Sequence, residues 1–390
     1  MGLAGLRHAA RATRPKAYLA QGVLFRALGH LLPELRRAPL RLTPPATDGP
    51  AVGDAPVISL ADAHPALVSF TSGSSGRPKA IRRTHGFLSA QGAALKPLLA
   101  SDRPDEVDLV AFPVFALMNL REGVASVLPP WVIRRPDRLD PAATARFVDE
   151  RRITRLLVPP SVIERLDGAR LPDRVARIFT GGGPVYPDLL RRVADIAPRA
   201  EPVAVYGSTE AEPIAHVAAH EIAAEDHAHM AAGGGILAGK PVPEVALRIV
   251  DDEIQVAGGH VVEGYLDPAD DASTKVRDGG RVWHRTGDAG RLDAQGRLWL
   301  LGRRDARAGG FYPFEVEVAA RTWSGVRRAT LVDGAGGPVL AVEGDGDTAE
   351  WERRAGQAFP GLRVVRVRST PMDRRHRSKV DYRRLKTMLR

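Results

Sequence analysis

The sequence contains no cysteine and only seven lysines, at positions 16, 79, 96, 240, 275, 379 and 386, among 56 basic residues. The absence of cysteine excludes disulfides, thiolate zinc sites, iron–sulfur clusters and cysteine nucleophiles. The sequence also lacks an uninterrupted apolar run of the ~20 residues that a transmembrane helix needs. Arginine supplies nearly all of the positive charge, so a lysine that stands in a motif carries more weight than usual.

Length and composition indicate a globular protein. The chain has 390 residues, of which 44% are hydrophobic and 26% are charged, and its formal net charge is +10. This length is typical of two or three domains of ~150 residues. The positive charge alone favours a nucleic-acid partner, but the basic residues are scattered among acids and no helix-turn-helix, zinc or RNA-binding signature is present. We therefore expect no nucleic-acid partner.

The first half of the chain predicts an α/β domain. Residues 1–50 are rich in Ala, Leu and Arg, which is typical of a transit peptide or, in the interpretation that we favour, of surface helices; residues 44–56 are a Pro/Gly-rich connector. Strand-like and helix-like segments alternate over 67–206, which predicts a mainly parallel sheet. The expected strands are Leu67–Phe70, Leu109–Pro113, Arg155–Val158, Ala176–Thr180 and Pro202–Tyr206.

The second half of the chain has a different pattern of hydrophobic runs and turns. Short alternating runs separated by turns predict a β-rich subdomain over 236–302, with a hairpin turn at Asp293–Gly296. The polar, glycine-containing residues 303–310 predict a hinge. Residues 311–390 then predict a small α+β domain that ends in a basic tail.

One segment, from Phe70 to Lys79, reads Phe-Thr-Ser-Gly-Ser-Ser-Gly-Arg-Pro-Lys. Glycines let backbone N–H groups approach an anion, hydroxyls add donors, and the lysine adds a point charge, which together suit a triphosphate. It is not a P-loop, because the Gly-Lys pair and its following hydroxyl are missing. A β-lactamase-type Ser-x-x-Lys is also incomplete, because its Ser-Asp-Asn and Lys-Thr-Gly partners are missing.

This segment resembles the phosphate loop of the AMP-forming adenylating enzymes, which include acyl-CoA synthetases, peptide-synthetase adenylation domains and luciferases. Further segments match the family's motifs in the correct order, so that the resemblance extends over 67–390. They are Val205–Glu210, Asp252–Val256 with Glu263–Pro268, Trp283–Asp288, Gly302–Asp305, Pro313–Glu317 and Ser378–Val380. The resemblance implies an α/β fold with a large N-terminal AMP/ATP-binding domain (1–302), a hinge around Asp305, and a small mobile lid domain (311–390).

The resemblance also implies roles for individual residues. The groups that surround the β- and γ-phosphates would be Thr71, Ser72, Gly73, Ser74, Ser75, Gly76 and Lys79. The residues that line the adenine and acyl pockets would be Gly182, Gly183 and Pro184, with Tyr206, Gly207 and Ser208 beside adenine. Each of these residues also has a structural alternative, as a flexible loop, a turn or ordinary core.

Five side chains would contact the polar and charged groups of the nucleotide, the metal ion and the acid. Thr209 would contact the α-phosphate, and Glu210 would bind Mg²⁺ as a hard oxygen ligand. Asp288, supported by Arg303, would accept from the ribose hydroxyls. Lys379 would bridge the substrate carboxylate and the α-phosphate as pyrophosphate leaves. A turn cap at Asp288, a helix-start carboxylate at Glu210 and a surface lysine at Lys379 are the alternatives.

The expected acid is hydrophobic. Residues 112–119 read Phe-Pro-Val-Phe-Ala-Leu-Met-Asn and contain no Asp. Amino-acid-activating members of the family usually begin this segment with an Asp that pairs with the substrate amine, so its absence favours a carboxylic acid without an α-amine, such as a fatty acid. Phe115, Leu117 and Met118 are candidates for the acid pocket, or are ordinary core.

The sequence leaves two alternatives for the second half-reaction, in which the acyl group leaves AMP. Motifs at 112–117, 283–288, 296–299 and 372–376 resemble the synthetases of bacterial olefin biosynthesis, which convert β-hydroxy acids to β-lactones through an acyl-AMP without CoA. Pro313–Glu317 instead follows the CoA-ligase pattern. The acyl acceptor is therefore CoA, a carrier protein or an intramolecular hydroxyl. A non-catalytic adenylate-binding accessory protein is the alternative of another class.

The segment ahead of the phosphate loop is shorter than this family usually has. We therefore expect either a naturally shortened member or an incomplete reading frame. The resemblance implies a cytoplasmic enzyme that uses ATP and Mg²⁺, with CoA as a candidate co-substrate.

Overall fold

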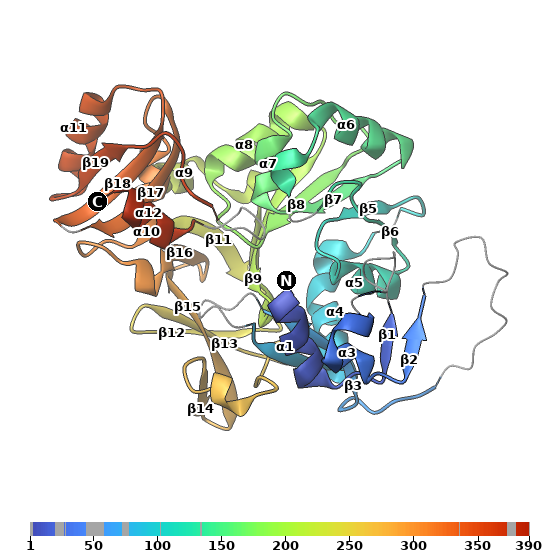
Figure 1. The fold of residues 1–390 in the computed structure, drawn as a ribbon. Helices are drawn as coiled ribbons and strands as arrows, with labels where there is room; N and C mark the ends of the chain where they lie inside the picture. The colour runs from blue at the N-terminus through green and yellow to red at the C-terminus, as the bar shows by residue number, and fades with distance from the viewer. Residues whose placement is uncertain are drawn as a thin grey trace. The chain divides into compact units, whose positions relative to one another are not determined.

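The computed structural model describes residues 3–19, 27, 29–43, 58–71, 78–101, 103–132, 135–334, 336–372 and 380–389. The chain divides into two compact units, whose elements are labelled in Figure 1. Unit 1 comprises Met1–Ala90 and Val262–Val276, and unit 2 comprises Gln91–Val261 and Arg277–Arg390. Within the described ranges, no helix is both long enough and apolar enough to cross a membrane.

Unit 1 contains short helices and two small sheets. Its elements are α1 (Leu3–Thr13), β1 (Ala17–Leu19), α3 (Pro33–Arg36), β2 (Leu40–Leu42), β3 (Pro65–Phe70) and β4 (Ala80–Thr84). Helix α1 packs on α3 through the buried side chains of Ala10, Leu32 and Leu35. The described part of residues 1–43 thus contains helices, as the surface-helix interpretation expects, and also a parallel β1–β2 pair that was not predicted.

Strand β3 corrects one prediction. The sequence assigned Leu67–Phe70 to a mainly parallel sheet, whereas the structure pairs β3 with β4 in an antiparallel sheet of their own. A parallel connection needs a crossover of a dozen or more residues, and only residues 71–79 separate the two strands. The backbone N–H of Thr71 donates to the carbonyl of Lys79 over 2.9 Å and closes this hairpin loop at its base.

Unit 2 is built on one large mixed sheet with the strand order β12-β13-β15-β16-β11-β10-β9-β8-β7-β5-β6. Its parallel strands are β5 (Val107–Val110), β6 (Ala125–Val127), β7 (Arg155–Val158), β8 (Arg177–Gly181) and β9 (Glu201–Ser208). Its antiparallel strands are β10 (Ala211–Ala218), β11 (Ile236–Pro241), β12 (Ala246–Val250), β13 (Glu253–Ala257), β15 (Arg281–Leu292) and β16 (Leu298–Arg303).

The sheet changes from parallel to antiparallel between β9 and β10. Only Thr209 and Glu210 connect these two strands, which is too short for a parallel crossover. The expected β-rich region is therefore continuous with the α/β region in one mixed sheet, and the expectation of a mainly parallel sheet is corrected to a mixed one.

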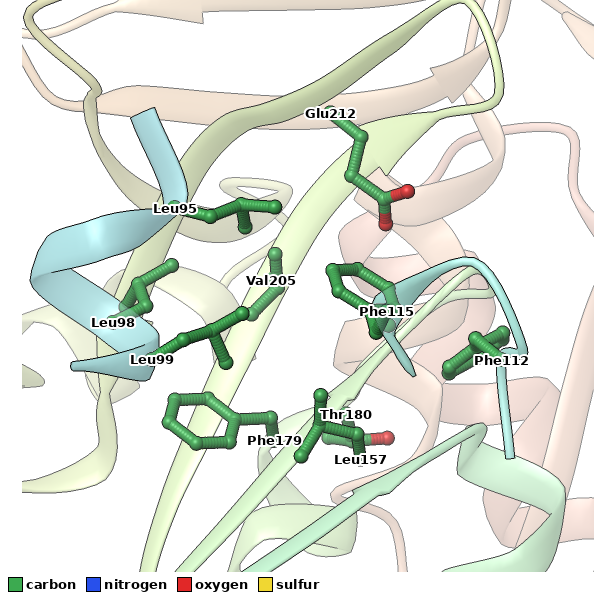
Figure 2. A pocket seen from close by; sticks show the side chains of 11 residues that line it. Leu95, Leu98, Leu99, Phe112, Phe115, Leu157, Phe179, Thr180, Val205 and Glu212 are labelled. Carbon is green, nitrogen blue, oxygen red and sulfur yellow. The ribbon is translucent and has the colours of Figure 1, made fainter. Parts of the chain in front are cut away.

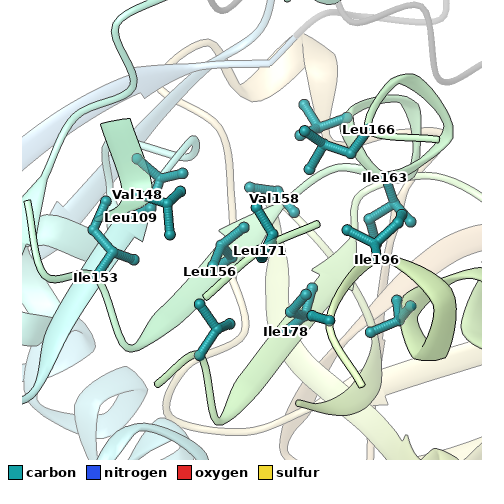
Figure 3. Close-up of a cluster of buried hydrophobic side chains, with 14 of the residues drawn as sticks. Leu109, Val148, Ile153, Leu156, Val158, Ile163, Leu166, Leu171, Ile178 and Ile196 are labelled. Atoms are coloured by element: carbon teal, nitrogen blue, oxygen red, sulfur yellow. The ribbon is translucent and has the colours of Figure 1, made fainter. Parts of the chain in front are cut away.

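Helices cover the parallel strands and form the main core. They are α5 (Phe115–Glu122), α6 (Pro141–Glu150), α7 (Pro160–Arg165) and α8 (Pro187–Ile196), while α4 (His85–Leu99) and β14 (Lys275–Asp278) each contain a boundary between the two units. Figure 3 shows Leu156, Val158 and Ile178 of the strands among Val148, Ile163 and Ile196 of the helices. All four residues of β7 are buried, as expected for a parallel strand that is covered on both faces.

One buried ion pair ties α5 to this sheet. Arg155 of β7 donates to both carboxylate oxygens of Asp108 on β5, over 2.7 and 2.9 Å, and Asn119 of α5 donates to Asp108 over 2.8 Å. Charges inside a protein need such partners, because burying an unpaired charge is very costly. The position of α5, which carries Phe115, is therefore fixed by hydrogen bonds as well as by packing.

The C-terminal residues of unit 2 have a core of their own. The elements are α10 (Pro313–Ala320), β17 (Val326–Gly334), β18 (Gly337–Gly344), α11 (Thr348–Ala358), β19 (Arg363–Arg366) and α12 (Tyr382–Met388), and helix α9 (Ala224–Ala231) precedes β11. Val316, Leu331, Leu340 and Trp351 are completely buried in this core. This region therefore combines helices with strands.

Candidate functional site

The turn between β9 and β10 presents a hydroxyl and a carboxylate. Thr209 is exposed and Glu210 is half-buried, and the backbone N–H of Glu210 donates to Ser208 Oγ over 3.2 Å. A Cβ at Gly207 would lie 2.9 Å from the carbonyl oxygen of Ala211, so the turn closes only with glycine there. The turn lies at the carboxyl end of a parallel strand, where open α/β sheets bind their ligands.

Asp288 on β15 accepts hydrogen bonds from two side chains. Tyr206 Oη donates to Asp288 Oδ2 over 2.9 Å, and Arg303 Nη1 donates to Asp288 Oδ1 over 3.2 Å. Burial and the Asp288 charge raise the pKa of Tyr206 well above its usual value, so the phenol stays protonated and acts as the donor. The Asp288 side chain is still 26% exposed, and the carboxylate is therefore both oriented and accessible.

Glycine at position 287 makes room for the guanidinium of Arg303. Asp288 and Arg303 are direct neighbours across the β15–β16 pair. Gly287 has a φ of +72°, and a Cβ there would lie 2.7 Å from Arg303 Nη2. The Thr-Gly-Asp motif therefore combines a backbone bend with the carboxylate that Arg303 supports.

A first pocket lies beside Tyr206. It encloses about 350 Å³, and among the predicted site residues it is lined by Gly183, Pro184 and Tyr206. Gly182 has a φ of +73° and does not line the pocket, but it turns the chain immediately before Gly183. The rest of the lining is apolar and includes a second aromatic residue, Phe314.

A second pocket, of about 400 Å³, is predominantly apolar (Figure 2). Its walls come from α4, the start of α5, and strands β7, β8 and β9 with the start of β10. The lining residues are Leu95, Leu98, Leu99, Phe112, Phe115, Leu157, Phe179, Thr180, Gly181, Val205 and Glu212. Such a lining suits the hydrocarbon part of an acid, with few polar groups to orient it.

The three predicted acid-pocket residues are not brought together. Phe115 lines the apolar pocket, but Leu117 is 42% exposed and Met118 is buried, and neither belongs to its lining. Successive residues of α5 point in different directions, so one short helix cannot direct all three side chains into one cavity. The assignment of Leu117 and Met118 to the pocket is therefore corrected.

Sequence reasoning missed most of the actual lining. Leu95, Leu98 and Leu99 stand at i, i+3 and i+4 on α4, a spacing that indicates one apolar helix face but not what this face covers. Thr180 and Glu212 flank the predicted motifs at 181–184 and 205–210. Their closeness to those motifs in the sequence is the signal that could have identified both residues as part of the lining.

In unit 1, Lys79 is held by two partners. Its Nζ donates to the carbonyl of Asp270 over 3.2 Å and lies 4.7 Å from the centre of the Tyr265 ring. His8 Nε2 makes a 3.0 Å hydrogen bond with the carbonyl of Pro78 and thereby joins α1 to the end of the loop. Thr71 is buried at the start of the loop. Ser72, Gly73, Ser74, Ser75 and Gly76 lie outside the described residues, as does Lys379.

The predicted hinge begins where β16 ends. Arg304–Ala306 forms a single 3₁₀ turn directly after Arg303. The Asp305 side chain is 76% exposed, and one of its oxygens lies 3.7 Å from Arg303 Nε. The same arginine therefore faces both Asp288 and Asp305.

Polar contacts join the C-terminal elements to α7 and α8. Arg321 donates to both oxygens of Asp188 over 2.9 and 2.6 Å, and Arg328 donates to Glu164 over 2.6 Å. Glu317 is buried and accepts from Tyr186 Oη over 2.5 Å. Burial raises the pKa of Glu317 to about 7.

Across the described part of the chain, no three His, Cys, Asp or Glu side chains gather in an arrangement that could hold a metal ion. Mg²⁺ in nucleotide sites is usually bound by one or two carboxylates together with substrate phosphates and water. A single carboxylate such as Glu210, at a turn, fits that mode of binding.

The family to which the chain belongs follows from its match to a known protein family. Residues 4–266 match the family described as AMP-binding enzyme. This match covers more than half of the chain, and the protein therefore belongs to the AMP-binding family of AMP-forming adenylating enzymes.

Among characterised relatives, the chain is similar to two olefin β-lactone synthetases. It is 33% identical to that of Stenotrophomonas maltophilia, with 82% of this chain and 66% of the relative covered. It is 32% identical to that of Xanthomonas campestris pv. campestris, with 87% and 69% covered. It is also 31% identical to an indoleacetate–CoA ligase of Aromatoleum aromaticum, with 65% and 51% covered. The chain thus spans about two thirds of the length of the synthetases and about half that of the ligase.

Solved structures show the same fold. The amide bond synthetase McbA from Marinactinospora thermotolerans matches with a TM-score of 0.76 at 23% identity, covering 100% of this chain and 83% of McbA. ATP-bound MatB from Rhodopseudomonas palustris matches with a TM-score of 0.75 at 20% identity, covering 100% and 82%. At these identities the likeness establishes the fold alone.

Proposed function

We propose that the protein activates a hydrophobic carboxylic acid with ATP. A carboxylate oxygen of the acid bonds to the α-phosphorus, the bond from that phosphorus to pyrophosphate breaks, and acyl-AMP and pyrophosphate result. The observation that supports this proposal is that the pocket beside Tyr206 and the apolar pocket share one lining residue, Val205. In this proposal the nucleotide occupies the first pocket and the acid occupies the second, and both pockets border β9.

The proposed roles follow the chemistry of each side chain. In unit 2, Tyr206 offers an aromatic face to adenine, and Asp288 accepts from the ribose hydroxyls while Arg303 holds it in place. Thr209 donates to the α-phosphate. Glu210 would bind Mg²⁺, which when bound neutralises phosphate charge. In unit 1, the loop from Thr71 to Lys79 is proposed to bind the β- and γ-phosphates.

Lys379 is the last residue of the proposed site, and its assignment rests on the family resemblance alone. Its ammonium group would lie between the acid carboxylate and the α-phosphate, where it stabilises the negative charge that develops during transfer. Lys79 and Lys379 are two of only seven lysines in an arginine-rich chain, and both stand at family lysine positions. A protein that only binds adenylates would have less need of Lys379.

We further propose that residues 303–310 are a hinge and that 311–390 form a lid with two poses. The exposed Asp305 and the single turn at Arg304–Ala306 support this role, because hinges are a few residues that absorb a change in backbone angles. The contacts of Arg321 with Asp188 and of Glu317 with Tyr186 would hold one pose. The other pose would present the acyl-AMP to its acceptor.

Two acyl acceptors are supported by different observations. Similarity to two olefin β-lactone synthetases favours an intramolecular hydroxyl, so that a β-hydroxyacyl-AMP closes to a β-lactone and releases AMP. Similarity to a CoA ligase, together with the Pro313–Glu317 motif, favours transfer to CoA.

The first half-reaction is tested by acid-dependent pyrophosphate release. The purified chain is incubated with Mg·ATP and a panel of aliphatic acids of 4 to 16 carbons, and ATP–pyrophosphate exchange is measured. Exchange that depends on the acid supports the proposal. A folded protein that binds ATP in calorimetry but shows no exchange with any acid would instead support a non-catalytic adenylate-binding protein.

The second half-reaction is tested by product analysis with a β-hydroxy acid. Parallel reactions with and without CoA are analysed by mass spectrometry. A β-lactone without CoA identifies intramolecular closure, whereas a thioester that forms only with CoA identifies a ligase.

A further inference from the structure

The Thr-Gly-Asp motif at 286–288 is a bulge in strand β15. The ladder pairs on either side of it join Glu253 to Ala289 and Gln255 to Arg285. Three residues of β15 thus stand opposite one residue of β13, in the strand that lies between β13 and β16 (Figure 1). A bulge takes its extra residues out of the ladder, and bulges beside active sites re-aim a side chain. The shape of this bulge therefore decides the direction of the carboxylate at its end.

The buried carboxylate of Glu253 holds the bulge in shape. Glu253 is 4% exposed, and its Oε1 accepts from the backbone N–H of Gly287 over 3.2 Å. Its Oε2 accepts from Arg285 Nε over 2.7 Å and from Arg304 Nη1 over 3.1 Å. The two guanidinium groups compensate the charge, as a buried carboxylate requires. One oxygen thus serves the arginines, and the other serves the bulge.

The peptide that Glu253 holds is linked directly to Asp288. Thr286 Oγ1 donates to the carbonyl of Ile254 over 2.9 Å and accepts from the backbone N–H of Asp288 over 3.1 Å. Arg303 Nη1 donates to the carbonyl of Thr286 over 2.9 Å as well as to Asp288. A shift of the peptide between residues 286 and 287 would therefore also shift the carboxylate that follows it.

We propose that Glu253 is a positioning residue that fixes the direction of Asp288 and thereby the recognition of the ribose hydroxyls. This inference rests on the proposed function, because it concerns the nucleotide site of that proposal. The carboxylate of Glu253 is occupied by Gly287 and two arginines, so it acts through the bulge and not on the nucleotide. Without it, the N–H of Gly287 loses its acceptor and the bulge must shift to find another.

The test measures binding and needs no turnover. Calorimetry gives the affinities of Mg·ATP and of Mg·2′,3′-dideoxy-ATP, which lacks both ribose hydroxyls, in the absence of any acid. The ratio of the two affinities reports how well Asp288 meets the ribose, which a general loss of stability would not change. The single variants are Glu253→Ala, Glu253→Gln, Arg304→Ala and Asp226→Ala.

Asp226 on α9 is the matched control. It is also a buried carboxylate, 4% exposed, that accepts from a backbone N–H, that of Ala223, over 3.1 Å. Arg297 donates to both of its oxygens over 2.8 Å. Asp226→Ala therefore removes a comparable set of contacts, but at a place that does not hold the bulge.

We expect the unaltered protein to bind ATP about 100-fold more tightly than dideoxy-ATP, because the hydroxyls donate to a charged group. In Glu253→Ala the ratio should fall to about tenfold or less, through weaker binding of ATP. Glu253→Gln keeps the shape of the side chain but only one acceptor oxygen, and its ratio should be intermediate. Arg304→Ala should keep the ratio, because Arg285 still pairs with Glu253, and Asp226→Ala should keep it as well.

Two further measurements separate positioning from a structural role. In an Asp288→Ala background, Glu253→Ala should cause no further loss of ATP affinity, because both changes act through the same carboxylate. Hydrogen exchange of peptides that contain residues 284–290, measured without nucleotide, should become faster in Glu253→Ala but not in Asp226→Ala. This second measurement tests the bulge even if the protein has no adenylating activity.

Several outcomes would overturn the inference. They are equal affinities of the unaltered protein for the two nucleotides, an unchanged ratio in Glu253→Ala, and additive losses in the double variant. A loss in Arg304→Ala as large as that in Glu253→Ala would also overturn it, because the effect would then arise at residue 304 and not at the bulge. Missing pyrophosphate exchange counts against the proposed enzyme, whereas the affinity ratio still decides the role of Glu253.

Discussion

The hydroxyl of Tyr206 donates to the carboxylate of Asp288 over 2.9 Å and joins two residues that lie 82 positions apart. The bond links the aromatic ring proposed to contact adenine with the carboxylate proposed to bind ribose. Arg303 contacts the other carboxylate oxygen, so both oxygens are held in place. This triad makes the nucleotide proposal open to a direct test.

Removal of the carboxylate should weaken ATP binding more than removal of its support. Asp288→Ala is expected to raise KM for ATP about 100-fold, because hydrogen bonds to a charged group contribute the most. Tyr206→Phe keeps the ring and is expected to raise it about tenfold. Asp333→Ala on β17 changes the charge equally at an exposed position and serves as the control. Unchanged ATP affinity in Asp288→Ala, measured by calorimetry, would remove it from the nucleotide site.

The proposed chemical role of Lys379 predicts separation of binding from turnover. Lys379→Ala should lose most of the exchange activity, by about 100-fold or more, because one stabilising group in the transition state is removed. Its ATP affinity should change little. The control is Lys386→Ala on α12, which removes an exposed lysine seven residues further along the chain. Equal turnover in both variants would rule out a role for Lys379 in the reaction.

Local sequence patterns predicted many elements well. The bounds of β7 coincide with the predicted strand Arg155–Val158, and β8 and β9 overlap the predicted strands Ala176–Thr180 and Pro202–Tyr206. Strand β10 was missed, because Ala211–Ala218 contains Glu, Pro and His and has little intrinsic strand preference. Its pairing with β9 follows from the two-residue turn at Thr209 and Glu210, which forces an antiparallel return.

The candidate site was predictable as a set of residues but not as a geometry. The motifs identified Tyr206, Asp288 and Arg303, yet no sequence spacing shows that the first donates to the second. Tertiary contacts also placed Leu117 on the surface.

A hinge at Asp305 should affect the two half-reactions unequally. Asp305→Pro restricts the backbone where the lid would turn, so adenylation should fall by less than about threefold while acyl transfer falls by about tenfold or more. Asp305→Ala removes the charge without the restriction and is the matched control. Single-turnover measurements separate the two steps. Equal loss of both steps in Asp305→Pro would contradict a hinge at this position.

The buried carboxyl of Glu317 should make stability depend on pH. Burial raises its pKa from 4.5 to about 7, so between these values the folded protein keeps a proton that the unfolded chain has released. The unfolded state then binds fewer protons, and the free energy of unfolding must fall as pH rises through this window. Below pH 4.5 and above pH 7 this contribution is constant.

Glu317→Gln cannot ionise and should lack this slope. Between pH 4.5 and 7.5, the free energy of unfolding of the unaltered protein should fall by about 3 kcal/mol relative to the variant, at ~1.4 kcal/mol per unit of pKa difference. Urea unfolding at a series of pH values measures it. Glu352→Gln, at an exposed position on α11, should follow the unaltered protein at every pH. If the curve of Glu317→Gln is parallel to that of Glu352→Gln across the window, Glu317 does not hold its proton to neutral pH. Its contact with Tyr186 is then that of an ionised carboxylate throughout the window, and the proposed lid contact would not change as pH rises.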